Sequence, residues 1–263
     1  MESSNYRDDG VNKIIEKLMS GHKNIFGDRM IGFYLYGSLV WGDFDITTSD
    51  IDTLCVIASE VTLDEIEKLR TMHEEIVCEN PQWRNRIEVH YAPIDGLKNF
   101  RTMPFKMGNI SPGEPLHIID SGKDWIDEWY CVQEYAITLY GIDKNKVIPH
   151  IEKQEFIQMI CKYAQSFRER IRTCKESCYS QAYAILTLCR ALYTVRSGEQ
   201  ISKPAAARWA MDFLPEYREL IHSALIWRKE RDMLLRNSNE TYIHAEKFVK
   251  DILDRYIEEK TWR

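Results

Sequence analysis

The sequence lacks an apolar run long enough to span a membrane. None of its stretches approaches the roughly 18 consecutive apolar residues that a transmembrane helix needs. The N-terminal stretch MESSNYRDDG also lacks the basic and then apolar pattern of a secretory signal peptide. We therefore expect a soluble, cytoplasmic protein with no membrane partner.

An excess of basic residues is missing as well. The 263 residues contain 35 Lys and Arg against 41 Asp and Glu, which gives a net charge of −6. A surface that binds nucleic acid needs clustered cations to neutralise phosphates. The composition therefore argues against a nucleic-acid partner and suits a small cationic ligand better.

Cysteine pairs at zinc-binding spacing are also absent. The seven cysteines are odd in number and scattered, and Cys55, Cys161 and Cys189 lie in apolar surroundings. Cys174 and Cys178 have the spacing of neighbours on one helix face, but no second pair accompanies them. We expect free thiols in a reducing compartment and no structural zinc.

What the sequence does contain is a motif between two β-like runs. Ile31–Tyr36 and Ile51–Ile57 are rich in β-branched and aromatic residues, which predicts two buried strands joined by a polar loop. Asp50 and Asp52 stand two apart at the start of the second run, so their side chains should share one face. Two convergent carboxylates are hard oxygen ligands that suit Mg²⁺.

The same motif also predicts a phosphate contact. Gly37 allows a close approach of the backbone, and Ser38 offers a hydroxyl and an amide donor. A second acidic pair, Asp43 and Asp45, lies among turn residues, and we interpret it as a solvated turn.

A third strand is predicted over 86–92, because RIEVHYA alternates strictly. Glu88 and His90 then share a face. Placed antiparallel to the Asp50–Asp52 strand, Glu88 could join the two aspartates, or it could be an exposed residue on an edge strand. We interpret His90 as a surface or core-edge residue.

The remaining N-terminal half predicts helices and one long loop. A helix capped by Asp8 or Asp9 should bury Val11, Ile14, Ile15, Leu18 and Met19, and a capping box from Thr62 to Glu65 should open a helix that buries Leu63, Ile66, Leu69 and Ile76. Proline and glycine between 100 and 122 predict an irregular loop. Asp124 is a plausible N-cap for a helix that runs to about Leu139.

Strand signals stop near Pro149, and helical patterns follow. The expected helices are 152–174, 179–197, 203–213, 216–236 and 240–260. The fold class is therefore an α/β (α+β) N-terminal domain with a mixed sheet, residues 1–145, and an all-α helical bundle, residues 146–263.

The motifs together carry a family resemblance. A Gly-Ser pair, eleven intervening residues and Asp-x-Asp resemble the signature of the DNA polymerase β-like nucleotidyltransferases. LTLCRALYTVRSGE (186–199) and SKPAAARWAMDFLP (202–215) are similar to the C-terminal domain of the streptomycin and spectinomycin adenylyltransferases. The resemblance covers nearly the whole chain.

This resemblance implies a role for each matching residue. Asp50 and Asp52 would bind Mg²⁺, and Glu88 would be the catalytic base. The residues that would bind ATP are Gly37, Ser38, Ser49, Asp124, Arg190 and Lys203. From the residues alone, Arg190 and Lys203 are ordinary solvated helix residues, and the helix cap explains Asp124.

The match is weaker where the acceptor should bind. This chain has Ser180 where the family has an acidic residue, and Tyr183 where the streptomycin-modifying members have a His. Glu176, Asp127 or Glu128 could replace the missing carboxylate, or the acceptor could differ. The resemblance implies a monomeric enzyme that transfers AMP from Mg-ATP to a cationic aminoglycoside or aminocyclitol antibiotic. The alternatives are a different acceptor, or a nucleotide-binding module without catalysis.

Overall fold

The computed structural model describes residues 9–229 and 238–257. The chain divides into two compact units. The first comprises Met1–Phe44 and Ser49–Ile151, and the second comprises Asp45–Thr48 and Glu152–Arg263. Each unit is described by itself.

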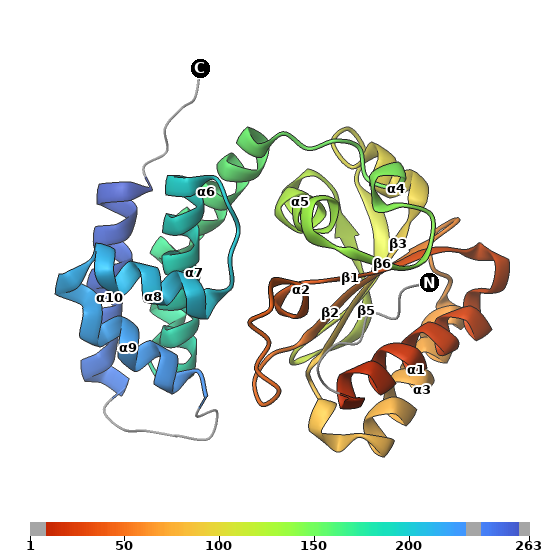
Figure 1. Cartoon of the computed structure of the whole chain (residues 1–263), viewed down its shortest axis with the longest axis horizontal. Coiled ribbons are helices and arrows are strands. Elements are labelled where there is room, and N and C mark those ends of the chain that lie inside the picture. The colour runs from red at the N-terminus through yellow and green to blue at the C-terminus, as the bar shows by residue number, and fades with distance from the viewer. Residues whose placement is uncertain (1–8, 230–237, 258–263) are drawn as a thin grey trace. The chain divides into compact units, whose positions relative to one another are not determined.

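A six-stranded mixed sheet is the centre of the first unit, as predicted (Figure 1). Its strands follow the order β5-β4-β3-β2-β1-β6, and only β2 and β3 pair in parallel among the recorded strand pairs. The strands are β1 Met30–Tyr36, β2 Ile51–Ile57, β3 Ile87–Pro93, β4 Phe105–Ser111, β5 Glu114–Ser121 and β6 Ile137–Gly141.

The parallel pairing of β2 and β3 corrects our expectation of an antiparallel pair. Helix α3, Leu63–Glu79, lies between the two strands in sequence and returns the chain to the end of the sheet from which β2 started. Such a strand, helix and strand unit produces a parallel pair.

Helices α1, Asp9–Phe26, and α3 pack on one face of the sheet (Figure 1). Their buried residues confirm the predicted helical periodicity, with Val11, Ile14 and Leu18 fully buried in α1. The other face carries α5, Ile126–Tyr135. Two shorter helices are α2, Ser38–Trp41, and α4, Ile94–Asn99.

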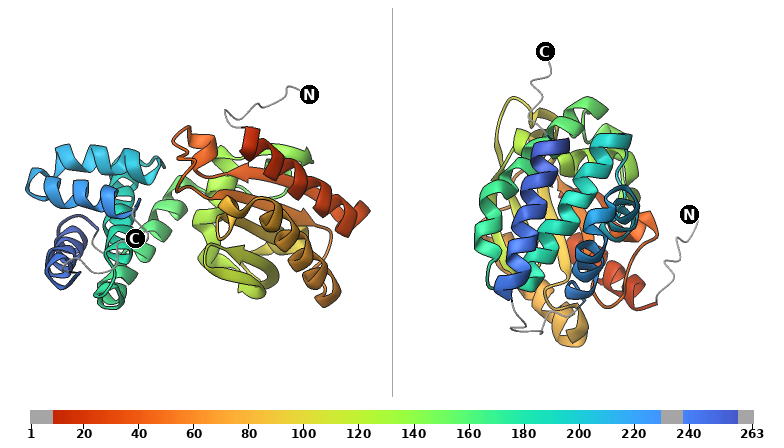
Figure 2. Two further views of the ribbon diagram at one scale, coloured as in Figure 1. Left: turned by 90° about the horizontal axis from the view of Figure 1, so that it is seen from below. Right: turned by 90° about the vertical axis from the view of Figure 1, so that its left-hand side faces the viewer.

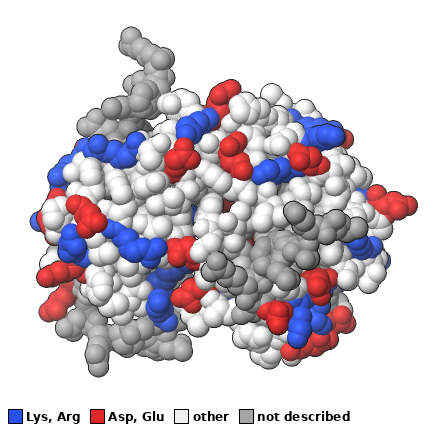
Figure 3. All heavy atoms as spheres, in the orientation of Figure 1, with Lys and Arg blue, Asp and Glu red and all other residues white. Residues whose placement is uncertain are grey.

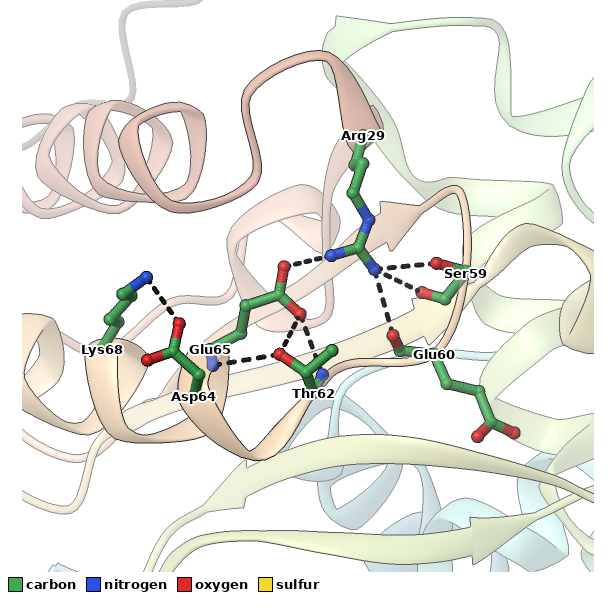
Figure 4. Close-up of polar contacts among 7 residues, drawn as sticks. All are labelled: Arg29, Ser59, Glu60, Thr62, Asp64, Glu65 and Lys68. Carbon is green, nitrogen blue, oxygen red and sulfur yellow. Dashed lines mark hydrogen bonds and ion pairs between the residues drawn. The ribbon is translucent and has the colours of Figure 1, made fainter.

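The predicted capping box at the start of α3 is present (Figure 4). Glu65 N donates to Thr62 Oγ1 at 3.3 Å, and Thr62 N donates to Glu65 Oε2 at 2.8 Å. Arg29 forms an ion pair with Glu65 and donates to Ser59 Oγ at 2.9 Å, which ties the start of β1 to this helix end. Leu63 is 75% exposed, contrary to prediction. Helical side chains point toward the N-terminus, so the first residue projects past the helix.

Two elements between 100 and 141 differ from the prediction. The expected loop contains the β4–β5 hairpin, whose turn is Pro112-Gly113, with Gly113 at φ 83°. The helix expected to reach Leu139 stops at Tyr135, and β6 then pairs antiparallel with β1. Gly141 is the last residue of this strand.

The second unit is helical, as predicted. Its helices are α6 Lys153–Arg170, α7 Cys178–Ser197, α8 Lys203–Phe213, α9 Arg218–Trp227 and α10 Ser238–Tyr256. Helices α6, α7 and α10 pack side by side (Figure 2). The last parts of two predicted helices, 230–236 and 258–260, lie outside the described residues.

Charged residues of both signs are interspersed over the face drawn in Figure 3. Of the helices that the structure describes, none combines the length and the apolar character required to cross a membrane.

Candidate active site

Gly37 brings the end of β1 against the carboxylate of Asp52. It has φ 75° and ψ −152°, a conformation that residues with a Cβ rarely adopt. A Cβ at this position would also collide with Asp52 Oδ2. Ser38 follows as the first residue of α2. Glycine is therefore required here both by the backbone angle and by the close approach.

Arg86 fixes the backbone immediately before Asp50. This arginine is buried, and its Nε and Nη2 donate to the Ser49 carbonyl oxygen at 3.1 and 2.5 Å. Its guanidinium lies 4.6 Å from the centre of the Trp83 ring. We did not predict this contact, because a single arginine at the start of a strand gives little signal. Ser49 is itself buried, so it supports the loop instead of facing solvent.

A row of three side chains crosses β1, β2 and β3. Tyr36 is the register partner of Asp52, and Asp52 is the register partner of Glu88. Residues directly opposite each other on neighbouring strands point to the same face. The structure thus brings Asp52 and Glu88 together, although the strands run parallel.

The Tyr36 hydroxyl lies among carboxylates. Tyr36 is 4% exposed, and its hydroxyl has no hydrogen-bond partner in the described part of the chain. Its pKa is raised well above the usual value by burial first, and then by the charges of Glu128, Glu88 and Asp52. Glu128 of α5 therefore belongs to the same polar cluster as Glu88. Glu128 is one of the three residues that could replace the missing acceptor carboxylate.

His90 is buried, which corrects our interpretation of it as a surface or core-edge residue. It is 1% exposed, and its ring packs edge to face on Trp125 at 5.2 Å. Nδ1 lies 2.7 Å from Asn109 Oδ1 on β4, and Nε2 lies 3.4 Å from Glu88 Oε1. Burial lowers the pKa of His90 to about 4, so the ring is neutral at pH 7.

Asp124 is not the helix cap that we predicted. It lies within the 3₁₀ turn Lys123–Trp125, and Trp125 occupies the N-cap position of α5. The N-cap therefore lies one residue later than expected.

No ready-made metal cage is present in residues 9–229 and 238–257. Nowhere in these residues do three or more His, Cys, Asp or Glu side chains gather in an arrangement that could hold a metal ion. The carboxylates of Asp50, Asp52 and Glu88 therefore do not form a complete protein site by themselves.

In the helical unit, two predicted cations gather around Tyr183. Lys203 Nζ lies 4.1 Å from the centre of the Tyr183 ring. The Tyr183 hydroxyl lies 3.0 Å from that of Tyr163. Burial and Tyr163 raise the pKa of Tyr183, whereas the positive charges of Arg190 and Arg170 oppose this rise. Helices α7 and α8 thus bring Arg190 and Lys203 to one locality.

The residues around Ser180 form the N-terminus of α7. Ser180 N donates to the Ser177 side chain at 3.1 Å. The Gln181 amide donates to the carbonyl oxygens of Cys174 and Ser238, at 3.2 and 3.0 Å. The Ser177 contact caps the helix, and the Gln181 contacts hold it against neighbouring backbone. None of these side chains is a carboxylate that could bind a cationic ligand.

The chain is similar to known proteins of one enzyme class. Residues 146–255 match the family described as aminoglycoside adenylyltransferase, C-terminal domain. Spectinomycin 9-adenylyltransferases from the Staphylococcus aureus strains Mu50 and N315 are each 26% identical over 207 residues, covering 74% of this chain and 75% of theirs.

A solved structure has the same fold. It is the crystal structure of spectinomycin adenyltransferase AAD(9) from Enterococcus faecialis with ATP and spectinomycin. The TM-score is 0.70 at 21% identity, over 91% of this chain and 99% of the other. The comparisons together indicate a nucleotidyltransferase that is similar to the aminoglycoside adenylyltransferases over residues 146–255 and shares its fold with a spectinomycin adenyltransferase.

Proposed function

We propose that the enzyme transfers the adenylyl group of Mg-ATP to a hydroxyl of an aminocyclitol or aminoglycoside antibiotic and releases pyrophosphate. The observation that carries this proposal is the register of β2 and β3, which sets Asp52 directly opposite Glu88. One carboxylate can then serve the metal and the other can serve the acceptor. The named relatives act on spectinomycin, which supports this class of acceptor.

Asp50 and Asp52 are the residues that we assign to Mg²⁺. Magnesium is commonly held by one or two carboxylates together with substrate phosphates, so a site without a third protein ligand fits this ion. When bound, the ion would neutralise phosphate charge and make the α-phosphorus easier to attack. Gly37 lets the Asp52 carboxylate lie against the end of β1. Gly37 and Ser38 are assigned to the nucleotide phosphates.

Four further residues are assigned to the nucleotide. Arg190 and Lys203 supply the positive charges that a triphosphate needs, and their shared locality around Tyr183 supports a joint role. Asp124, which lies in the turn before α5, is also assigned to the nucleotide, as the family resemblance implies. Ser49 would act indirectly, through the backbone that Arg86 holds.

Glu88 is assigned as the general base. It would remove the proton from the acceptor hydroxyl while the acceptor oxygen bonds to the α-phosphorus and the bond to pyrophosphate breaks. Glu128 is the carboxylate that we assign to the cationic group of the acceptor, since its charge reaches the same Tyr36 hydroxyl as Glu88 does. The enzyme would act as a cytoplasmic monomer.

The test is a pyrophosphate-release assay over spectinomycin, streptomycin, lincosamides and amino acids, with the product mass measured for each. We expect release with an aminocyclitol or aminoglycoside, and a mass gain of one AMP on that acceptor. AMP transfer only to another class would move the assignment to that acceptor. Mg-ATP binding without release for any compound would contradict catalysis.

A separate variant tests the acceptor contact. Glu128→Gln should raise KM for the cationic acceptor and leave the affinity for Mg-ATP unchanged. Glu114→Gln on the exposed start of β5 is the matched control. An unchanged KM in Glu128→Gln would remove this carboxylate from the acceptor site.

A further inference from the structure

His90 lies directly behind the residue that we assign as the base. It stands two positions after Glu88 on β3, so both side chains point to the same face of the sheet. The Nε2 atom lies 3.4 Å from Glu88 Oε1 and, in the part of the chain that the structure describes, has no hydrogen-bond partner. A buried polar nitrogen without a partner is uncommon in a folded protein and calls for an explanation.

Asn109 determines which nitrogen of His90 carries the proton. The Asn109 Oδ1 is the atom that faces His90, and the Asn109 amide nitrogen donates to Ser111 Oγ at 3.0 Å. A carbonyl oxygen can only accept, and therefore the Nδ1 of His90, 2.7 Å away, donates. In a neutral imidazole the other nitrogen, Nε2, is then unprotonated.

An unprotonated Nε2 and an ionised carboxylate are both acceptors. They cannot form a hydrogen bond with each other, and the 3.4 Å separation agrees with this. The situation changes when Glu88 takes up a proton, because its new O–H can donate to Nε2. The arrangement of Asn109, His90 and Glu88 thus favours the protonated form of the base.

We propose that His90 is a positioning residue for Glu88, and that its Nε2 accepts a hydrogen bond from the carboxylic acid that forms when Glu88 takes the acceptor proton. This inference rests on the proposed function. In the step, the acceptor O–H bond breaks, the proton moves to Glu88, the acceptor oxygen bonds to the α-phosphorus, and the bond to pyrophosphate breaks. His90 gains no proton, and Asn109 keeps its tautomer fixed.

Other neighbours of His90 are compatible with a neutral ring. Trp125 and Trp129 cover it from one side with edge-to-face contacts at 5.2 and 6.2 Å. The Tyr36 ring lies 6.4 Å away. The burial that lowers the pKa of His90 keeps the ring neutral at pH 7 and leaves Nε2 available as an acceptor.

Kinetics of paired variants test the proposal. His90→Asn retains an N–H that can reach Asn109 but removes the acceptor that faces Glu88, so kcat should fall about tenfold or more while Mg-ATP affinity changes less than about twofold. His90→Gln, which can return a carbonyl oxygen near the Nε2 position, should recover part of the loss. Equal, near wild-type kcat in folded His90→Asn and His90→Gln would overturn the proposal.

Histidine side-chain ¹⁵N NMR gives a readout that does not depend on turnover. Wild-type His90 should show the Nδ1–H tautomer. In Glu88→Gln the new amide N–H imitates the protonated base, so the Nε2 resonance should shift as it accepts a hydrogen bond. An Nε2–H tautomer, or the same Nε2 resonance in both proteins, would overturn the role of His90. Failure of the wild type to release pyrophosphate with any acceptor would instead overturn the proposed function.

Discussion

The two faces of the six-stranded sheet use similar residues for different ends. On one face, the Tyr91 hydroxyl lies 2.9 Å from His22 Nε2 of α1 and 2.7 Å from His73 Nε2 of α3. On the other face, His90 lies between Asn109 and Glu88. Tyr91 and His90 are consecutive in β3, so their side chains point to opposite faces of the sheet. Tyr91 belongs to a network inside the core, whereas His90 lies beside the row of Tyr36, Asp52 and Glu88.

Burial lowers the histidine pKa on both faces, so a lowered pKa does not by itself mark the functional face. What differs is where each network ends. His22, Tyr91 and His73 contact one another inside an apolar core. The chain of contacts from Asn109 ends at a carboxylate that is partly exposed. A buried hydrogen-bond network that ends at an exposed side chain is therefore a better candidate for function than one that ends inside the core.

The largest effect on kcat is expected from substitution of Asp52, on the face of the sheet that carries Glu88. Asp52→Asn should lower kcat by about 10³ or more and leave the fold intact, because this partly exposed carboxylate serves the metal and contributes little to the core. Asp50→Asn should behave in the same way. Asp120→Asn, an exposed residue of β5, is the control. Near-normal turnover of either site variant at saturating Mg²⁺ would contradict the assignment.

The core network of His22, Tyr91 and His73 should affect stability at low pH. The pKa of His73 is lowered to about 4 by burial, and that of His22 is lowered by burial and by His73. The unfolded chain then binds protons that the folded chain refuses, so stability is complete above about pH 6.5 and falls toward pH 4. The loss of stability at His73 is up to about 3 kcal/mol. The free energy of unfolding in urea, measured from pH 7.5 to 5, should depend less steeply on pH in His73→Gln than in the wild type. Equal pH dependence in the two proteins would refute this prediction.

Glu88→Gln should act on chemistry and not on the nucleotide. The amide keeps the size of the side chain but cannot take a proton, so kcat should fall by about 10² or more while Mg-ATP affinity is retained. Single-turnover kinetics with calorimetric binding measure both quantities. Loss of metal-dependent ATP binding would make Glu88 a metal ligand, and an unchanged chemical step would require another base.

Several strands and helices, and the placement of two side chains, could be predicted from the sequence. The β-branched runs predicted β1 and β2, and the alternation in RIEVHYA placed Glu88 and His90 on one face. Helix α8 begins and ends where its pattern predicted. These predictions succeeded because they depend on local periodicity.

The errors arose where distant contacts decide the structure. The prolines and glycines between 100 and 122 suggested a loop, yet Pro112-Gly113 forms a tight turn and Pro115 lies in β5, an edge strand that tolerates it. A Cβ at Gly108 would come within 3.3 Å of Tyr91, so this glycine allows a close contact within the sheet. The burial of His90 depends on Trp125 and Trp129, which no local pattern links to β3.

A smaller effect is expected at Arg190 and Lys203 of the helical unit. Arg190→Ala or Lys203→Ala should remove a charge-assisted contact of about 1.5 to 3 kcal/mol and weaken ATP binding about tenfold or more. Lys247→Ala, exposed on α10, is the matched control. Unchanged ATP affinity by calorimetry in both site variants would mean that these are ordinary solvated residues.

The smallest expected effect separates two tyrosines on the same strand and the same face. The Tyr34 hydroxyl donates to the Ile142 carbonyl oxygen at 2.8 Å, whereas the buried Tyr36 hydroxyl has no partner in the described residues. Tyr34→Phe should therefore destabilise the ligand-free protein by about 1 kcal/mol, and Tyr36→Phe should change its stability by less than about 0.5 kcal/mol. Urea unfolding of both variants under identical conditions provides the measurement, and each variant is the control for the other. An equal loss of stability in Tyr36→Phe would mean that the Tyr36 hydroxyl has a hydrogen-bond partner in solution. The Tyr36 hydroxyl would then resemble that of Tyr91, which is hydrogen-bonded within the core.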